Sequence, residues 1–236
     1  MLIGMVVVFA SAAHQRNLVW KNELSLWSDV VKKSPNKARP YNNLADACEK
    51  RGLIDRAILL AKKSIALNPN LAEPHNNLGI CYLDKGWADK AAREFKRAIR
   101  IKPDFARAHS NLGLAYSMQG QQDMAIAQHK QALNVNPYFA DAHNNLGICY
   151  FDKGWVDKAV SQFQHAIQID PNHADVHYNL GVAYGSKGKY DMAFKEMRIA
   201  KRLSSSQQWK KTVKGTNGEM PSIPGHRQKV ESRELP

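Results

Sequence analysis

A fixed step of 34 residues governs most of this 236-residue chain. Proline and glycine both return with this step, at Pro35, Pro69, Pro103, Pro137 and Pro171 and at Gly52, Gly86, Gly120, Gly154 and Gly188. Three further columns keep the same phase: Leu44, Leu78, Leu112, Leu146 and Leu180; Tyr82, Tyr116, Tyr150 and Tyr184; Ala57, Ala91, Ala125, Ala159 and Ala193. A single period of this length indicates a repeat architecture, in which copies of one small unit stack on each other.

Each unit contains two helical patterns. Apolar or small residues fall at i, i+3, i+4 and i+7 at His75, Leu78, Gly79 and Tyr82, and a second helical pattern follows Gly86. The glycine suits the end of the first helix, where the backbone turns left-handed, and the proline ends the second helix. The sequence therefore predicts an all-α fold of stacked helix pairs.

The segment HNNLGICYLDKGWADKAAREFKRAIRIKP, which begins at His75, resembles the tetratricopeptide-repeat (TPR) family closely. The resemblance implies a right-handed α-α superhelix of about five helix-turn-helix repeats. The five repeats are expected at residues 38–71, 72–105, 106–139, 140–173 and 174–205. The first repeat departs from the family pattern at Ala45 and Cys48, and the fifth at Ser205, as terminal repeats commonly do. Repeats two and four match at 21 of 34 positions, whereas repeats two and three match at 13, which indicates a duplicated pair.

Four segments outside the repeats receive separate predictions. Residues 14–37 are expected to form a half repeat that covers the first full one, residues 206–214 a polar capping helix, and residues 215–236 a disordered basic tail. The apolar segment 1–13 is expected to be the end of a transmembrane helix. Leu2–Ala13 is shorter than the roughly 20 residues that span a bilayer. A signal peptide fits poorly because no basic residue precedes this segment.

Residues 16–44 resemble the junction between the membrane region and the repeats in transmembrane O-mannosyltransferases with C-terminal TPRs. This resemblance implies that the chain is a non-catalytic portion of a membrane glycosyltransferase, or a descendant that lost the catalytic part. We therefore expect a membrane-associated protein of the cell envelope. The side of the membrane stays open, since Arg16 and Lys21 favour the cytoplasm while the family resemblance favours the opposite side.

The formal net charge of +13 is concentrated at the ends. Residues 1–40 carry six Lys or Arg against two acids, and residues 198–236 carry nine against three. Such flanks are most often solvated tails, and the alternative is contact with anionic lipid or nucleic acid. They lack the interleaved aromatic residues of single-strand binders, so no nucleic-acid partner is expected.

Position 6 of every repeat, counted from its first residue, is asparagine: Asn43, Asn77, Asn111, Asn145 and Asn179. Helical geometry places this column opposite the packed face, where an amide has no core role and can bond both groups of a peptide backbone. The column resembles the asparagine ladder of the TPR superhelix of O-linked N-acetylglucosamine transferase, which implies a peptide-binding role. The alternative is that asparagine is inherited consensus.

Further residues of the same face complete the predicted peptide groove. They are the neighbouring amides Asn76 and Asn144 and the apolar side chains Ile80, Leu114, Ile148 and Val182. Only Arg39, Lys50 and Arg107 supply cations there, so a basic clamp for a C-terminal carboxylate is not assembled. We therefore expect internal, extended polypeptide segments as ligands, with backbone bonds for affinity and apolar pockets for selectivity.

No residue pattern predicts chemistry. The column of His75, His109, His143 and His177 invites a metal interpretation, but its members lie about 10 Å apart, one repeat each, and are expected in the core. Cys48, Cys81 and Cys149 have no CxxC spacing and are expected as small buried residues. We expect no catalytic residue, cofactor, metal or small-molecule substrate. The two leading hypotheses are a peptide-binding scaffold and the accessory part of a glycosyltransferase that presents its polypeptide acceptor.

Overall fold

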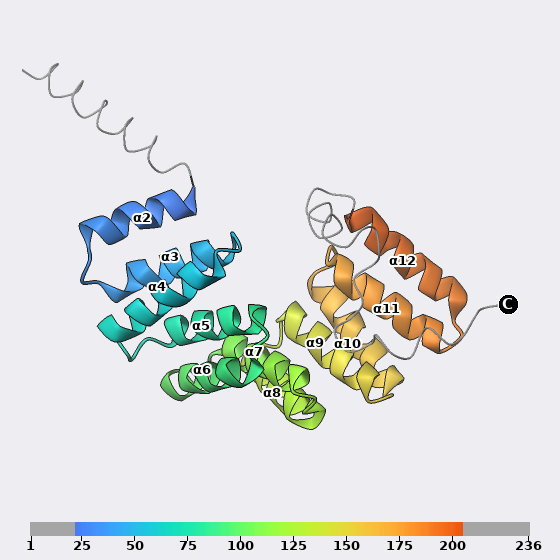
Figure 1. The fold of residues 1–236 in the computed structure, drawn as a ribbon. Coiled ribbons are helices and arrows are strands. Elements are labelled where there is room, and N and C mark those ends of the chain that lie inside the picture. Colours follow the sequence, from blue (N-terminus) through green and yellow to red (C-terminus); the bar gives the residue numbers. More distant parts are fainter. Residues whose placement is uncertain (1–21, 205–236) are drawn as a thin grey trace, which may run out of the picture. The chain divides into compact units, whose positions relative to one another are not determined.

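The computed structural model describes residues 22–204, which form eleven α-helices and no strand (Figure 1). The all-α prediction is therefore confirmed for this part of the chain. The chain divides into two compact units, residues 1–103 and 104–236, which we call unit 1 and unit 2.

Unit 1 contains two helix pairs and one preceding helix. Its helices are α2 (Glu23–Lys33), α3 (Ala38–Glu49), α4 (Ile54–Leu67), α5 (Ala72–Asp84) and α6 (Ala88–Ile101). The closest packing lies within the pairs α3–α4 and α5–α6, and α4 joins the first pair to the second by packing on α5. Helix α2 packs on α3, the first helix of the first pair.

Unit 2 repeats the same arrangement three times. Its helices are α7 (Ala106–Met118), α8 (Gln122–Val135), α9 (Ala140–Asp152), α10 (Val156–Ile169), α11 (Ala174–Ser186) and α12 (Tyr190–Ser204). Helices α7–α8, α9–α10 and α11–α12 form pairs, and α8 and α10 each pack on the first helix of the next pair. We call the first helix of each pair helix A and the second helix B.

Each pair turns at a glycine with a left-handed backbone. At the joint between α5 and α6, Gly86 has φ +75°, and the amide of Trp87 donates to the carbonyl of Tyr82 at 2.8 Å. This is the bond that closes a Schellman motif at a helix end. A Cβ on Gly86 would meet no atom within 4 Å, so the backbone angle alone explains the glycine.

A second glycine column has a different cause. Gly79 lies in the middle of α5, and a Cβ there would lie 2.5 Å from the ring of Phe95 on α6. In unit 2 a Cβ on Gly147 would lie 2.6 Å from the ring of Phe163. These glycines therefore allow an aromatic ring of helix B to lie directly on the backbone of helix A.

The columns that keep the 34-residue phase form the core. Each leucine of its column is 3% exposed, and the alanine column is between 0% and 5% exposed. Cys48, Cys81 and Cys149 are buried and form no disulfide among the described residues. Burial raises the pKa of all three thiols, that of Cys81 to about 12, so these thiols are held in the unreactive protonated form.

Ion pairs add a second link between successive pairs. The ammonium group of Lys85, at the end of α5, lies 2.8 Å from the carboxylate of Asp55, in the first turn of α4. Lys153 with Asp123 and Lys187 with Asp157 repeat this link in unit 2, each again 30 residues apart. Because one partner of each pair is largely exposed, these links contribute little to the free energy of unfolding.

Three predicted segments lie outside the described residues: the apolar segment 1–13, the capping helix 206–214 and the tail 215–236. Within residues 22–204, no helix combines the length and hydropathy that a membrane span needs. Of the half repeat 14–37, the described part is α2, which begins at Asn22 with a capping box.

One repeat carries a histidine where its neighbours have the core phenylalanine. His129 occupies the place of Phe95 and Phe163, is 0% exposed, and packs on Gly113. Its Nδ1 lies 3.4 Å from Ser110 Oγ, and its Nε2 has no hydrogen-bond partner among the described residues. Burial lowers the pKa of this imidazole from 6.5 to about 4, since the charged ring would lose its hydration.

We predict that His129 makes unit 2 less stable in mild acid. Unfolded His129 takes up a proton near pH 6.5, whereas the folded ring resists protonation until about pH 4. The free energy of unfolding is therefore not reduced by this residue above pH 6.5. It declines as the pH falls below that value, by about 2 kcal/mol at a pH of about 5. Urea unfolding of wild type and His129→Phe at pH about 7.5 and about 5 measures this term.

The phenylalanine variant keeps every other titrating group, including the pair of His173 and Asp141. The wild type should therefore lose more stability between the two pH values than the variant does. Equal losses in the two proteins would contradict the burial of an uncharged His129.

Candidate functional site

The structure places the asparagine column on the A helices at different depths. Asn43, Asn77, Asn111 and Asn145 are half-buried, whereas Asn179 is buried. The neighbouring amides Asn76 and Asn144 are also buried, at 1% and 8% exposure. The expectation that the position-6 amides have no core role is therefore wrong for Asn179, and Asn76 and Asn144, which were expected in the peptide groove, are buried as well.

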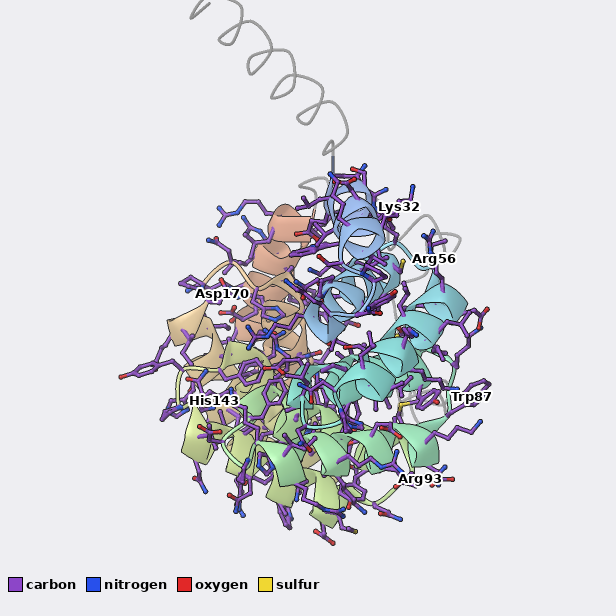
Figure 2. The ribbon with its side chains drawn as sticks, turned by 90° about the vertical axis from the view of Figure 1, so that its left-hand side faces the viewer. Lys32, Arg56, Trp87, Arg93, His143 and Asp170 are labelled. Carbon is purple, nitrogen blue, oxygen red and sulfur yellow. The ribbon has the colours of Figure 1, made fainter. Side chains whose placement is uncertain are left out.

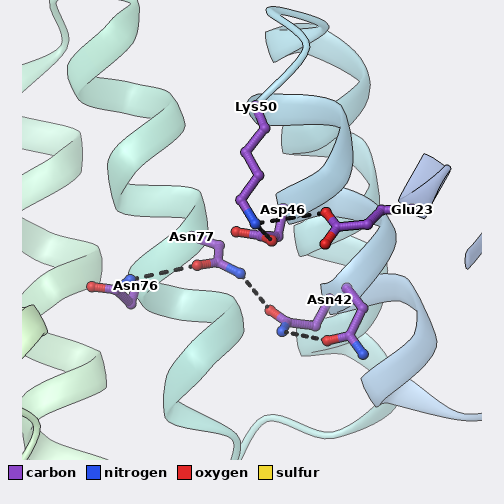
Figure 3. A network of polar contacts seen from close by, with 7 residues as sticks. Glu23, Asn42, Asp46, Lys50, Asn76 and Asn77 are labelled. Atoms are coloured by element: carbon purple, nitrogen blue, oxygen red, sulfur yellow. Dashed lines mark hydrogen bonds and ion pairs between the residues drawn. The ribbon is translucent and has the colours of Figure 1, made fainter. Parts of the chain in front are cut away.

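These amides form hydrogen bonds between successive repeats, which accounts for their burial. Asn77 Nδ2 donates to Oδ1 of Asn42 in the preceding repeat at 2.9 Å, and Asn42 in turn donates to Asn43 (Figure 3). In unit 2, Asn179 Nδ2 donates to Oδ1 of Asn144, also at 2.9 Å. The position-6 amide thus bonds the position-5 amide of the repeat before it, 35 residues away.

Asn145 breaks this pattern. The preceding repeat has Ser110 at position 5, and the Ser110 hydroxyl faces His129 Nδ1. Among the described residues, the side chain of Asn145 makes no hydrogen bond, although it lies on α9 in the same register as Asn179 on α11. Its donor and acceptor are therefore both available to a ligand.

The predicted apolar residues lie beside the amides on the same helices. Ile80, Leu114, Ile148 and Val182 are all half-buried. In unit 2 the same face also presents Met118, which is 52% exposed, and the half-buried Phe151. We call Leu114, Met118, Asn145, Ile148, Phe151 and Val182 the unit 2 face.

The corresponding face of unit 1 is acidic. Asp46, Glu49 and Asp84 take the places that Leu114, Ser117 and Asp152 hold in unit 2. Burial raises the pKa of Glu49, and the nearby charges of Asp84 and Asp46 raise it further; burial also raises the pKa of Asp84. The repeats therefore build an acidic surface in unit 1 and a mainly apolar one in unit 2.

Lys50 does not provide a free anion-binding group on this face. Its ammonium group lies 2.8 Å from Asp46 and 3.7 Å from Glu23 (Figure 3). Of the three cations that the sequence predicts for the peptide groove, Lys50 is therefore already paired with carboxylates of unit 1.

The histidine column pairs within each repeat. Each Nδ1 meets a helix B side chain 19 residues later, in His75–Glu94, His109–Gln128, His143–Gln162 and His177–Glu196, at 2.6 to 2.9 Å. The histidines thus join helix A to helix B; His75 and His177 are buried, as expected for core residues, whereas His109 and His143 are half-buried. Among residues 22–204 there is no cluster of three or more groups suited to a metal ion.

Comparison with known families identifies the chain. A model described as TPR repeat matches residues 82–120, 118–154 and 149–188. Two models described as Tetratricopeptide repeat match residues 60–93 and residues 38–71 and 174–206. The chain therefore belongs to the tetratricopeptide-repeat family, whose members typically serve as non-catalytic protein-interaction scaffolds.

One curated relative is the protein O-mannosyl-transferase Tmtc3 of Drosophila melanogaster, which is 32% identical over 63 residues. That match covers 27% of this chain and 7% of the relative. The chain thus shares only a short stretch with a much longer protein.

Two solved structures share the fold over nearly their whole length. MamA is 30% identical, covers 72% of this chain and 97% of its own, and superposes with a TM-score of 0.58. TTC0263, a thermophilic TPR protein of Thermus thermophilus, is 25% identical, covers 75% and 94%, and gives a TM-score of 0.62.

We predict that two adjacent asparagines of α9 differ in their effect on stability. Asn144→Ala removes the acceptor of the buried Asn179 amide and should cost about 1–3 kcal/mol of the free energy of unfolding. Asn145→Ala removes no hydrogen bond within the described residues and should change it by less than about 0.5 kcal/mol. Urea unfolding of both variants measures the difference, and equal costs would show that the inter-repeat amide bond is not what separates them.

Proposed function

We propose that the unit 2 face binds an extended polypeptide segment, and that the protein acts as a peptide-binding scaffold. The observation that carries the proposal is the Asn145 amide, which retains its donor and its acceptor next to Ile148. A backbone in extended conformation presents one C=O and one N–H to such an amide, so a single side chain can make two bonds.

The apolar residues of this face suit the side chains of the same ligand. Leu114, Ile148 and Val182 recur once per repeat, which places them about 8–10 Å apart when neighbouring helices pack at the usual distance. Three residues of extended chain cover about 10 Å. In the extended polyproline II conformation, which repeats every three residues, a ligand with an apolar side chain at every third residue would therefore contact all three positions.

The electrostatics of the two units favour different ligands. The six residues that define the unit 2 face are uncharged, and Asp152, at the repeat position of Asp84, lies beside them. Asp46, Glu49 and Asp84 together would repel an acidic peptide from the same face of unit 1. We therefore infer that the segment bound by unit 2 is apolar to neutral in sequence.

Peptide selection on the full chain tests the proposal. Peptides of twelve residues, selected from a random displayed library, should bind the wild type and lose at least tenfold in affinity for Asn145→Ala combined with Ile148→Ser. Two lost hydrogen bonds at about 0.5–1.5 kcal/mol each and one lost apolar contact exceed the roughly 1.4 kcal/mol that a tenfold change requires.

A control variant, Gln168→Ala, changes an exposed residue on helix B of the same repeat and should bind as the wild type does. If the selected peptides bind the double variant and the wild type equally, and the melting temperatures of the two proteins agree, the unit 2 face is not the binding surface.

A second candidate function rests on the partial match to the O-mannosyl-transferase Tmtc3. If the chain serves a membrane glycosyltransferase, the segment held by the repeats would be a polypeptide acceptor with hydroxyl side chains. Peptides selected on the wild type would then be enriched in Ser and Thr over the starting library. A selected set without that enrichment would favour the general scaffold.

A further inference from the structure

The outer face of helix α6 carries five exposed cations. They are Lys90, Arg93, Lys96, Arg97 and Arg100, which we call the α6 stripe. Four of them, at 90, 93, 97 and 100, fall at helical spacings of three and four residues and so share one side of the helix. With a rise of about 1.5 Å per residue, the stripe is about 15 Å long. Figure 2 shows Arg93 and the neighbouring Trp87 directed outwards along one edge of unit 1.

The fold of the repeat does not require these charges. Helix α10 is built from the duplicate of this repeat and buries Ala159, Phe163 and Ala166, where α6 buries Ala91, Phe95 and Ala98. Yet five of the 13 positions at which the two repeats differ exchange a cation for a neutral or acidic residue: Arg93/Ser161, Lys96/Gln164, Arg97/His165, Arg100/Gln168 and Lys102/Asp170. The core has thus been kept while the charge of the exposed face differs.

Helix α6 carries two acids, Asp89 and Glu94, against these five cations. Glu94 is buried and accepts from Arg97 Nη1 at 2.6 Å, while its other oxygen lies 2.7 Å from His75 Nδ1. Lys90 lies over the ring of Trp87, 4.0 Å from its centroid. Helix α4 of the same unit adds Arg56, Lys62 and Lys63 at the repeat positions of Lys90, Lys96 and Arg97. The B helices of unit 1 therefore present a positive surface, whereas α8 and α10 each balance one Asp with one Lys.

We propose that the α6 stripe is a second docking site, distinct from the unit 2 face, and that it binds an acidic polypeptide segment. Three of its five cations are arginines, whose planar guanidinium groups bind carboxylates by two parallel hydrogen bonds. A stripe of about 15 Å matches four or five residues of extended chain. Trp87 and Ile101, which are 44% and 37% exposed, lie at its two ends and offer apolar contacts to side chains of the same segment.

A polypeptide fits this surface better than the other polyanions. Single-stranded nucleic acid gains its affinity from bases stacked on open aromatic faces, and the Trp87 ring already has Lys90 over it and Tyr82 5.8 Å away. The α6 cations at 90, 93, 97 and 100 lie in one line along the helix, which suits a narrow polypeptide chain better than the broad area of a bilayer. An acidic segment would place its carboxylates along the same short line as these cations.

The test compares two charge-matched variants of the full chain, with fluorescein-labelled decaglutamate as the probe. Arg93→Ser, Lys96→Gln and Arg100→Gln together install the residues of repeat four and leave Arg97 on Glu94. Lys195→Ser, Arg198→Gln and Lys201→Gln remove the same number of exposed cations from α12. We expect the α6 variant to bind decaglutamate at least tenfold more weakly than the wild type at about 0.1 M salt, and the α12 variant to stay within twofold.

Other outcomes overturn the proposal. Equal weakening of the two variants would show that only net charge matters. If the wild-type protein binds decaglutamate no better than decaglutamine, the stripe does not bind acidic segments. An α6 variant that loses binding to phosphatidylserine vesicles or to a 12-nucleotide single strand, but not to decaglutamate, would assign the stripe to lipid or nucleic acid. The Asn145→Ala, Ile148→Ser variant should bind decaglutamate as the wild type does, so failure of the unit 2 face and failure of the stripe are distinguishable.

Discussion

The close approach of the two helices in each pair is the constraint on which the rest of the structure depends. In repeats two to five, an aromatic ring or a long side chain of helix B lies on a glycine of helix A, as Phe95 does on Gly79 and Met197 on Gly181, at distances that no Cβ would tolerate. The first repeat has Ala45 at this position. This contact fixes how the two helices face each other, and the alanine column, 0% exposed at Ala57, Ala91, Ala125 and Ala159, fills the same narrow space. Only when the pairs have this shape can the next pair stack on them and complete the shared core.

Most of this architecture could be predicted from the sequence because a repeated constraint leaves a repeated residue. The leucine, alanine, tyrosine and glycine columns are required for packing or for a turn, so the same residue type returns every 34 residues and marks the helix pairs. The two glycine columns look alike in the sequence, but their causes differ. Gly86 is required by a backbone angle of +75°, whereas Gly79 is required by the ring of Phe95. Only the three-dimensional structure shows which of the two reasons applies to each glycine.

The candidate site could be predicted only in outline. The asparagine column was visible, and the apolar residues beside it lie half-buried as a ligand surface requires. The bond from Asn179 to Asn144 was not foreseen, because it joins residues 35 apart whose side chains meet only after two repeats have stacked. A signal was nevertheless present: position 5 is Asn in repeats one, two and four but Ser110 in repeat three. Since Ser110 faces His129 instead, one exchange in the core leaves the amide of Asn145 without its structural partner.

In a chain built by duplication, the positions that depart from the repeat are therefore more informative about function than those that keep it. Residues shared by repeats two and four satisfy the same packing demands and cannot distinguish one repeat from another. The residues that differ are released from those demands. Arg93 on α6 and Ser161 on α10 occupy the same repeat position, and each helix buries the equivalent phenylalanine. The core therefore accepts either residue, and their difference concerns what each surface meets. By the same logic the neutral unit 2 face and the acidic residues of unit 1 are two surfaces on one scaffold. A protein of this construction can hold chemically different segments on different repeats, because each repeat needs only its columns to fold.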